Sequence, residues 1–315
     1  MRLRALVPSH FVEEIRAQAD ALGVDLAGYG QDGSTGNEAL GAVAFFRWWL
    51  PAETGDRIIR AFPLRWVHTG SAGVNHIITP TFLESGATLT NSAGVHAPSI
   101  AEWVIATLLA ETKAPEQVYR QQREHSWKVV RSFEIGGTRA VILGGGNIAR
   151  EVARRLRAMD VFVAAVTKHG TPDDSFDAVG PGSSLLALVA DADWLIVAAP
   201  LTDETRGIIS SNVIAALPER ARLINVARGE LVDESALLDA LESRRIAGAI
   251  LDVFETEPLP TDHRFWDMDN VRVLPHTTWR SDQVSARQLS LFLENLGRFV
   301  RNEPLRNVVN LSLGY

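Results

Sequence analysis

Short apolar runs alternate with stretches of helical spacing along the whole chain. Residues Phe11–Leu22 repeat apolar positions at the spacing of a helix, whereas Leu3–Val7 is a short continuous apolar run. Runs of the second kind predict strands, and their alternation with helices implies parallel strands joined by crossover helices. The first series of predicted strands comprises residues 3–7, 24–26, 41–46, 66–68 and 88–90.

A second series of strands and helices begins at Arg139. Its helices lie between the strands, and Asp233 stands where the N-cap of a helix over residues 234–241 is expected. Two such series predict an α/β protein with two doubly wound parallel-sheet domains. The strands predicted for the second series are residues 139–143, 161–166, 194–198, 223–226, 249–253 and 271–274.

Two long helices bear on where the domains begin and end. Residues 97–113 are apolar on nearly every side, which predicts burial either between two domains or between two subunits. A final helix over residues 281–300 and the tail 308–311 have no place in the second sheet, so we expect them to fold back on the first series. The predicted domains are residues 1–95 plus 285–315 as one discontinuous unit, and residues 96–284 as the other.

Composition narrows the classes of function. Lys and Arg number 31 against 38 Asp and Glu, so the net charge of −7 disfavours binding to nucleic acid. The absence of cysteine excludes disulfides, thiolate metal sites and cysteine nucleophiles. The first apolar run stops at Pro8, too early for a signal peptide, and no stretch reaches the roughly 18 apolar residues of a membrane span. We therefore expect a cytoplasmic protein that uses no metal and binds neither nucleic acid nor membrane.

A glycine-rich loop follows the strand that ends at Leu143. The sequence Gly144-Gly145-Gly146-Asn147-Ile148-Ala149 is a G-x-G-x-x-A pattern between a predicted strand and a predicted helix. Gly144 permits a tight turn, and Gly146 lets the backbone approach a pyrophosphate, which the helix N-terminus would then bind. A turn that binds nothing is the alternative, but the strand–turn–helix context favours a Rossmann domain. The residues predicted to bind cofactor here are Gly144, Gly146, Asn147 and Ile148.

The end of the next strand distinguishes two cofactors. An acidic residue there would accept the ribose 2′-hydroxyl of NAD, but Thr167 occupies the position and is followed by Lys168 and His169. A missing carboxylate removes repulsion toward a 2′-phosphate, and a lysine supplies charge for it. We therefore predict that NADP(H) is favoured and that NAD(H) is the alternative, with Lys168 then a solvated loop charge.

Three polar residues follow predicted strands of the second series. Arg228, Glu257 and His276 lie beyond the carboxyl ends of strands, where open parallel sheets bind ligands. Reduction of a keto acid needs a cation for the carboxylate or carbonyl, a proton donor for the developing alkoxide, and a carboxylate to orient that donor. Each residue alone also has a structural interpretation, as a turn cap, a loop acid or a buried histidine. Together, behind a dinucleotide loop, they predict a catalytic trio.

The sequence resembles the D-isomer-specific 2-hydroxyacid dehydrogenases, in their glyoxylate/hydroxypyruvate reductase-like branch, over nearly the whole chain. The most specific stretches are residues 223–234, 251–259 and 275–277, together with Ala199-Pro200-Leu201-Thr202 and Thr205-Arg206-Gly207. The resemblance implies that Arg228 binds the keto acid, that His276 is the acid/base, and that Glu257 pairs with it. It also implies a flavodoxin-like, discontinuous substrate domain and a homodimer formed through the cofactor domain.

The resemblance also implies further binding residues. Backbone amides of Ser71, Ala72 and Gly73 would hold the substrate carboxylate, and Asp252 would lie near the nicotinamide. Trp48 and Trp279 are departures from the family's pattern, and we predict that they narrow the substrate pocket or stack on an aromatic or branched substrate, unless they belong to the core. The remaining residues implied to contact cofactor are Pro200, Thr205, Val226, Ala227 and Thr278.

Two alternative functions remain open. A formate-type dehydrogenase typically has glutamine where Glu257 stands, because formate oxidation releases no proton to an acid/base pair. A dinucleotide-sensing corepressor keeps the catalytic trio but carries extra terminal segments for its partners. The favoured function is hydride transfer between NAD(P)H and a 2-keto acid, of glyoxylate or hydroxypyruvate type or bulkier, to give a D-2-hydroxy acid.

Overall fold

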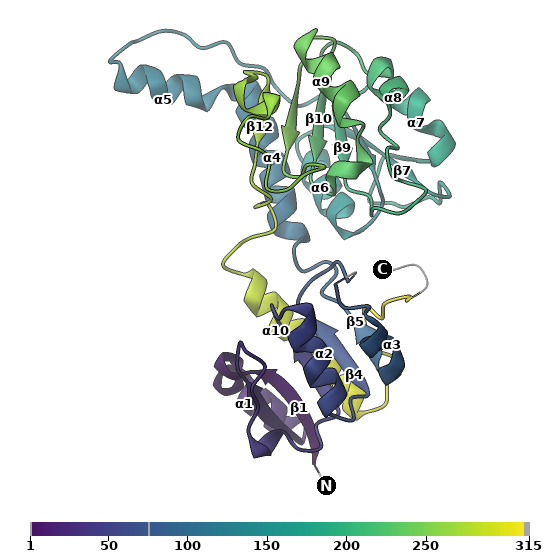
Figure 1. Cartoon of the computed structure of the whole chain (residues 1–315). Helices are drawn as coiled ribbons and strands as arrows, with labels where there is room; N and C mark the ends of the chain where they lie inside the picture. The colour runs from purple at the N-terminus through teal and green to yellow at the C-terminus, as the bar shows by residue number, and fades with distance from the viewer. Residues whose placement is uncertain (1, 75, 312–315) are drawn as a thin grey trace. The chain divides into compact units, whose positions relative to one another are not determined.

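Two units of structure make up the chain (Figure 1). The computed structural model describes residues 2–74 and 76–311. One unit comprises residues 1–96 with 281–315, and the other comprises residues 97–280. Each unit is built around one parallel sheet.

The first unit holds a sheet with strand order β2-β1-β3-β4-β5, all parallel. This is the flavodoxin-like doubly wound order, and it agrees with the fold predicted from the alternating pattern. The strands are β1 (Leu3–Pro8), β2 (Val24–Tyr29), β3 (Ala44–Arg47), β4 (Trp66–Thr69) and β5 (Thr88–Thr90). The helices are α1 (Val12–Ala21), α2 (Ala52–Ala61), α3 (Pro80–Ser85) and α10 (Val284–Val300), with 3-10 turns at Ser9–Phe11 and Asn37–Ala39.

The C-terminal helix α10 belongs to the core of the first unit. Alternate residues of a strand face opposite sides of the sheet. The face carrying Phe46 and Trp66 packs against α1 and α10, whereas the face carrying Phe45 packs against α2 and α3. On α10, Phe292 is fully buried and stacks on Phe46 at 4.8 Å and on Trp66 at 5.3 Å between ring centroids. After the helix, Val309 N donates to Leu89 O, so the tail also packs on this unit.

The second unit holds a parallel sheet that, within the described residues, has seven strands in the order β12-β11-β10-β9-β6-β7-β8. Its strand β8 (Ala178–Pro181) was not predicted, because this short edge strand is only partly buried and ends in Gly-Pro. The other strands are β6 (Arg139–Leu143), β7 (Phe162–Thr167), β9 (Trp194–Val197), β10 (Arg222–Asn225), β11 (Gly248–Leu251) and β12 (Val271–Val273).

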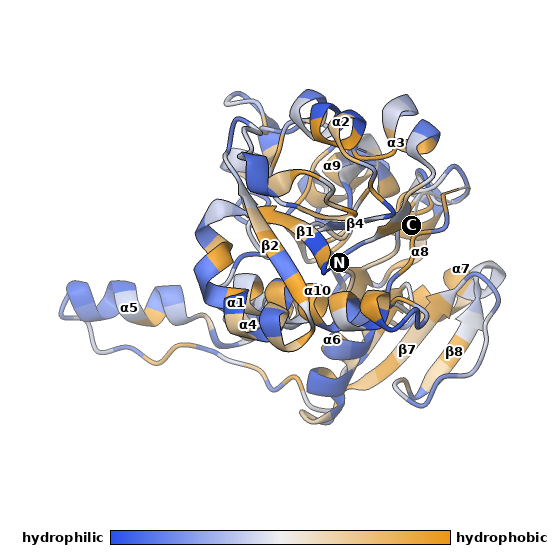
Figure 2. Cartoon of the chain, turned by 90° about the horizontal axis from the view of Figure 1, so that it is seen from below, coloured by the Kyte–Doolittle hydropathy of each residue, from blue (hydrophilic) through white to orange (hydrophobic). Residues whose placement is uncertain are grey.

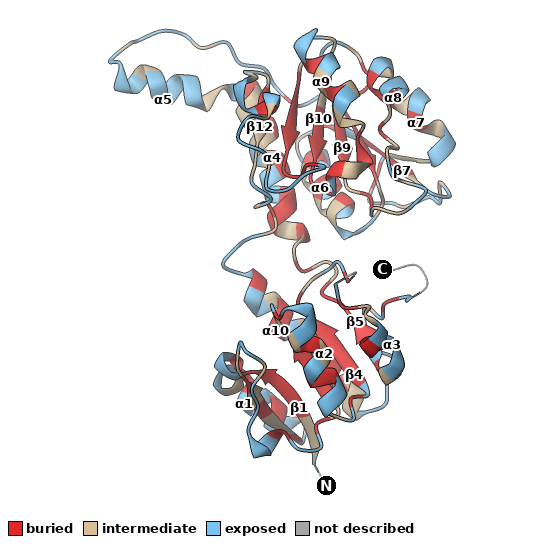
Figure 3. Cartoon of the chain, in the orientation of Figure 1, coloured by how far each residue is buried: buried red, intermediate tan, exposed pale blue. Residues whose placement is uncertain are grey.

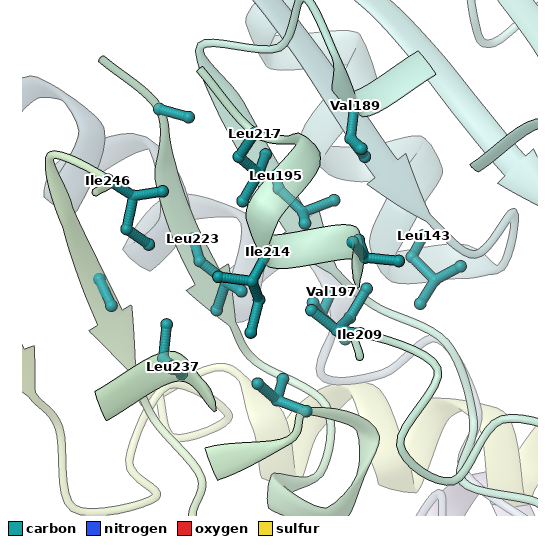
Figure 4. Packing of buried hydrophobic residues seen from close by; sticks show 14 of the residues in the cluster. Leu143, Val189, Leu195, Val197, Ile209, Ile214, Leu217, Leu223, Leu237 and Ile246 are labelled. Atoms are coloured by element: carbon teal, nitrogen blue, oxygen red, sulfur yellow. The ribbon is translucent and has the colours of Figure 1, made fainter. Parts of the chain in front are cut away.

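Helices cover both faces of this second sheet, which explains why its strands are continuous apolar runs rather than alternating ones (Figure 3). Figure 4 shows one of the two cores, where Leu195 and Leu223 of neighbouring strands meet Ile214 of α8. Asp233 caps α9 as predicted, accepting a hydrogen bond from Ala236 N at 3.0 Å. The helices are α4 (Ala97–Lys113), α5 (Pro115–Arg123), α6 (Asn147–Arg157), α7 (Leu185–Val189), α8 (Ser211–Ala216) and α9 (Glu234–Glu242), with 3-10 turns at Gly182–Ser184, Gly229–Leu231 and Arg264–Asp267.

Helix α4 is only partly buried in the single chain, and helix α5 was not predicted. Within one chain, α4 is buried on one side only: Val104 and Leu108 are buried, whereas Trp103 is 37% exposed. Helix α5 has no buried residue and, with the stretch that follows it, extends away from the body of the second unit (Figures 1 and 2). Figure 2 shows α5 as mostly hydrophilic, so no apolar pattern predicted it. In the described part of the chain, none of these helices is long and apolar enough to span a membrane.

Candidate active site

The carboxyl ends of three neighbouring strands of the second sheet carry the predicted chemistry. Arg228 follows β10, Asp252 follows β11 and His276 follows β12. These strands are parallel neighbours in the order β12-β11-β10, so their carboxyl ends share one edge of the sheet. This is the edge at which open α/β sheets bind their ligands.

His276 and Glu257 form a hydrogen-bonded pair. Nδ1 of His276 lies 2.7 Å from Oε2 of Glu257, and the other carboxylate oxygen accepts from Phe254 N at 3.1 Å. An ionised carboxylate can only accept hydrogen bonds, so Nδ1 carries the proton that joins the pair. Nε2 of His276 makes no hydrogen bond to any residue that the structure describes, and the side chain is 42% exposed. The pair therefore leaves Nε2 available to a ligand.

Asp252 holds the turn that presents His276. His276 has a left-handed φ of +48°, which is uncommon for a residue with a side chain. Buried Asp252 accepts hydrogen bonds from Thr277 N at 2.8 Å and from Thr278 Oγ1 at 2.6 Å, and Trp279 Nε1 donates to His276 O at 2.9 Å. Burial raises the pKa of Asp252, while the hydrogen bonds from Thr278 and Thr277 act in the opposite direction. The position of the imidazole is thus fixed by groups on both sides of it.

Arg228 lies exposed on a turn that Asn225 stabilises. Nδ2 of Asn225 donates to Arg228 O at 2.8 Å, and its Oδ1 accepts from Ala227 N at 3.1 Å. The guanidinium donates to Ala227 O at 2.6 Å and makes no hydrogen bond to His276 or Glu257 within the described chain. The next residue, Gly229, lies against the backbone at Phe254, on the segment that leads to Glu257. The structure therefore joins His276 to Glu257 directly and places the Arg228 turn against their supporting segment.

The glycine loop after β6 has the geometry that a pyrophosphate requires. Gly144 has a φ of +114°, and a Cβ there would lie 2.7 Å from Ala198 O, so only glycine fits. A Cβ on Gly146 would instead project into open space, which leaves room for a phosphate at the N-terminus of α6. Asn147 and Ile148 are the first residues of that helix, and Ala149 is fully buried against the core. These residues fit a dinucleotide.

The turn after β7 contains an ion pair that no local pattern in the sequence predicts. Lys168 Nζ lies 2.7 Å from Oε2 of Glu204, which belongs to the loop between β9 and α8. The hydrogen bond and the charge of Lys168 lower the pKa of Glu204. Thr167, at the end of β7, accepts a hydrogen bond from Gly170 N at 3.0 Å. The predicted 2′-phosphate site therefore contains a carboxylate opposite its lysine.

The other residues predicted to contact cofactor are engaged with the protein itself. Thr205 donates to Pro200 O at 2.7 Å and accepts from Thr202 N at 2.8 Å, which closes the turn after β9. Three more residues predicted to contact cofactor are nearly completely buried, namely Val226, Ala227 and Thr278. Their contacts with cofactor stay predictions.

The residues predicted to bind substrate belong to both units. Ser71, Ala72 and Gly73 follow β4, at the carboxyl edge of the first sheet. Trp48 follows the neighbouring strand β3 and is half-buried, with its ring 4.9 Å from Phe11, so much of it belongs to the core. Trp279 lies in the second unit beside His276. Their contacts with substrate stay predictions.

Comparisons with known proteins identify the family. The model of the D-isomer specific 2-hydroxyacid dehydrogenase NAD binding domain matches residues 105–278, more than half of the chain. The chain belongs to this family. It is 32% identical to glyoxylate/hydroxypyruvate reductase B of Pectobacterium carotovorum, over 81% of this chain and 82% of that protein.

Solved structures agree with this assignment. A D-isomer specific 2-hydroxyacid dehydrogenase from Xanthobacter autotrophicus, in complex with NADPH and MES, is 28% identical and aligns with a TM-score of 0.81 over 100% of this chain and 99% of that one. An NADPH-dependent glyoxylate/hydroxypyruvate reductase from Sinorhizobium meliloti, in complex with NADP and sulfate, is 26% identical and aligns with a TM-score of 0.78 over the full length of both chains. The chain is thus an NAD(P)-dependent oxidoreductase that interconverts a 2-keto acid and a D-2-hydroxy acid.

Proposed function

We propose that this enzyme reduces a 2-keto acid with His276 as the proton donor, Glu257 as its orienting partner and Arg228 as the substrate-binding cation. The observation that carries the proposal is the 2.7 Å hydrogen bond between His276 Nδ1 and Glu257, which leaves Nε2 available for the substrate oxygen. A histidine held in one orientation by a carboxylate is a suitable general acid.

The reaction converts the C2 carbonyl to a hydroxyl, which requires a hydride at C2 and a proton at oxygen. The nicotinamide, when bound, supplies the hydride. His276 Nε2 gives its proton to the carbonyl oxygen as the C=O double bond becomes single, and Glu257 keeps the Nδ1 proton in place throughout. Arg228 binds the carboxylate or polarises the carbonyl through its planar fork of N–H donors.

The two units divide the work in this proposal. The first unit, with the loop Ser71–Gly73, would be the substrate domain, and the second, with the glycine loop after β6, the cofactor domain. Amides of Ser71, Ala72 and Gly73 would bind the substrate carboxylate. Trp48 and Trp279 would limit the size of its side chain.

NADP(H) is the favoured cofactor. Thr167 leaves no carboxylate at the position that would accept the ribose 2′-hydroxyl of NAD, and Lys168 offers charge for a 2′-phosphate. Both solved relatives described above carry NADPH or NADP, which supports the same cofactor here. Glu204 acts against this preference because its carboxylate neutralises Lys168.

A homodimer formed through the second unit is the favoured assembly. Trp127 and Val129, in the extended stretch after α5, are 100% and 97% exposed, and Phe133 and Tyr119 are also exposed. Clustered exposed apolar side chains mark an interface, and a second copy presents the same surface, as a twofold dimer requires. Light scattering at micromolar concentration should give twice the 34.4 kDa mass of the chain. The double variant Trp127→Ser, Val129→Ser should give the mass of a single chain.

The decisive experiment is a panel of 2-keto acids run with NADPH and with NADH. We expect turnover of glyoxylate, hydroxypyruvate or a bulkier keto acid, with higher kcat/KM for NADPH. His276→Ala should lower kcat by about 10²–10⁴, as expected for loss of a general acid, and leave cofactor binding unchanged. Cofactor binding without oxidation of NADPH by any keto acid would contradict the proposal and favour a sensing role. The cytoplasmic location stays a prediction.

A further inference from the structure

In the loop from Thr69 to Gly73, every backbone carbonyl group accepts a hydrogen bond. Their donors come from three separate segments of the first unit. In order, Thr69 O accepts from Ser92 Oγ at 2.8 Å, Gly70 O from Gln288 Nε2, Ser71 O from Ser92 N at 3.0 Å, Ala72 O from Asn91 Nδ2 at 2.7 Å, and Gly73 O from Ser71 Oγ at 2.8 Å.

This pattern fixes where the amides of the loop point. In a trans peptide the C=O of one residue and the N–H of the next point in opposite directions. The carbonyls of residues 70, 71 and 72 bond into the protein, so the N–H groups of Ser71, Ala72 and Gly73 are turned the other way. The Ser71 N–H donates to Thr69 Oγ1 at 3.3 Å within the loop. Within the described residues, the amides of Ala72 and Gly73 donate to no acceptor. The loop therefore presents successive N–H groups that suit an anion.

Gln288 is the most distant of these donors in sequence and the least expected. It lies on α10, 218 residues from Gly70, and is completely buried. Gly70 leaves no space on this side, because a Cβ there would lie 3.2 Å from Gln288 Nε2 and 3.0 Å from the ring of Trp48. The peptide after Gly70 is thus held between helix α10 and the end of β3.

The side chain of Gln288 is more polar than its buried position requires. Its Oε1 is buried and accepts no hydrogen bond from the part of the chain that the structure describes. A buried acceptor without a partner destabilises a fold, and an apolar side chain of similar length would avoid that loss. The contribution of the amide is therefore its bond to Gly70 O rather than the packing of the helix.

We infer that Gln288 is a positioning residue for substrate binding: through Gly70 O it fixes the loop whose next N–H groups, those of Ala72 and Gly73, would face the substrate carboxylate. The inference rests on the proposed role of the Ser71–Gly73 loop. Gln288 does not touch substrate. It acts through Gly70, and so links the C-terminal helix to the carboxylate site.

Gln288→Met tests this inference, because methionine keeps the length of the side chain and removes the donor. We expect KM for the preferred keto acid to rise about tenfold, the loss that follows when a hydrogen bond to a charged group is weakened. Neither kcat nor KM for the cofactor should change more than about twofold, since the general acid and the glycine loop lie on the other unit. If Gln288→Met does not fold, Gln288→Leu, which also removes the donor, is used in its place.

Asn295→Leu is the matched control. Asn295 lies on the same helix, is equally buried, and bonds to Arg306 O at 3.0 Å and Arg306 N at 2.8 Å. Its loss should lower the melting temperature without a selective rise in KM. A proportional change of KM in both variants would show that helix stability alone is involved, and would overturn the inference.

Hydrogen–deuterium exchange separates this inference from the proposed function. In the free protein, Gln288→Met should speed exchange in the peptide covering residues 69–74 more than Asn295→Leu does. Unchanged exchange, or faster exchange with unchanged KM, overturns the role of Gln288 while the reductase activity stands. If the wild-type enzyme reduces no keto acid, the proposed function fails, and the exchange rates still decide whether Gln288 holds the loop.

Discussion

Gly229 offers a sharp test of how the catalytic segments are packed. A Cβ added at this position would lie 2.0 Å from the carbonyl carbon of Phe254 and 2.3 Å from Glu255 N. The shorter distance falls 1.4 Å below the 3.4 Å at which ordinary contact begins. The obstacles are backbone atoms, so no side-chain rotation relieves them. Gly229→Ala must therefore move one segment relative to the other by about an ångström.

The displaced segments carry the residues that we propose to be catalytic. Arg228 directly precedes Gly229, and Phe254 N donates at 3.1 Å to the carboxylate of Glu257, the partner of His276. A misplacement of about 1 Å in a catalytic group costs roughly 10²-fold in rate. We expect kcat/KM for the keto acid to fall by about that factor, and the melting temperature to fall with it.

Steady-state kinetics and a thermal melt measure these two effects. Gly182→Ala is the control, because a Cβ at Gly182 meets no atom within 4 Å. Titration of NADPH by fluorescence should give near wild-type affinity in Gly229→Ala, since the glycine loop is on another strand. A Gly229→Ala enzyme with wild-type kcat/KM and melting temperature would refute the close packing of these segments.

Three further predictions concern charge. Glu204→Gln should raise kcat/KM for NADPH by about threefold and leave NADH unaffected, because it removes a negative charge beside Lys168 that would repel a 2′-phosphate; equal changes with both cofactors would contradict this. Arg228→Lys should raise KM for the keto acid about tenfold, since a point charge does not replace the bidentate fork, and an unchanged KM would remove Arg228 from the substrate site. Burial lowers the pKa of His68 from 6.5 to about 3, so the unfolded chain takes up a proton that the fold excludes. The free energy of unfolding is therefore unaffected by His68 above pH 6.5 and falls as the pH drops from 6.5 toward 3. By pH 5 the loss is about 2 kcal/mol. Chemical denaturation at pH 7 and pH 5 should show this loss, and His68→Gln should show a smaller one.

The sequence alone predicted most of the strands and the segments that carry the trio. Buried strands such as β9 are continuous apolar runs, and the order of strands and helices leaves few topologies for a parallel sheet. Edge strand β8 and helix α5 were not predicted, because neither has a fully buried residue within the chain.

The missing parts of the site share one cause. Glu204 lies 36 residues from Lys168, and Gln288 lies 218 residues from Gly70. No local spacing connects such pairs, since only the finished fold brings them together. Asp252 is a partial exception: the family resemblance implied a role for it, but its bonds to Thr277 and Thr278 depend on the pairing of β11 with β12.

The stacking of Phe292 on Phe46 and Trp66 sets an order of events during synthesis on the ribosome. Residues 97–280 form a continuous unit, which can close its core as soon as it has left the exit tunnel. The first unit emerges earlier but waits for α10 to cover one face of its sheet. Helix α1 can cover its part of that face early, but the part that α10 covers is completed only after α10 has left the tunnel, so the unit whose synthesis begins first is the unit completed last.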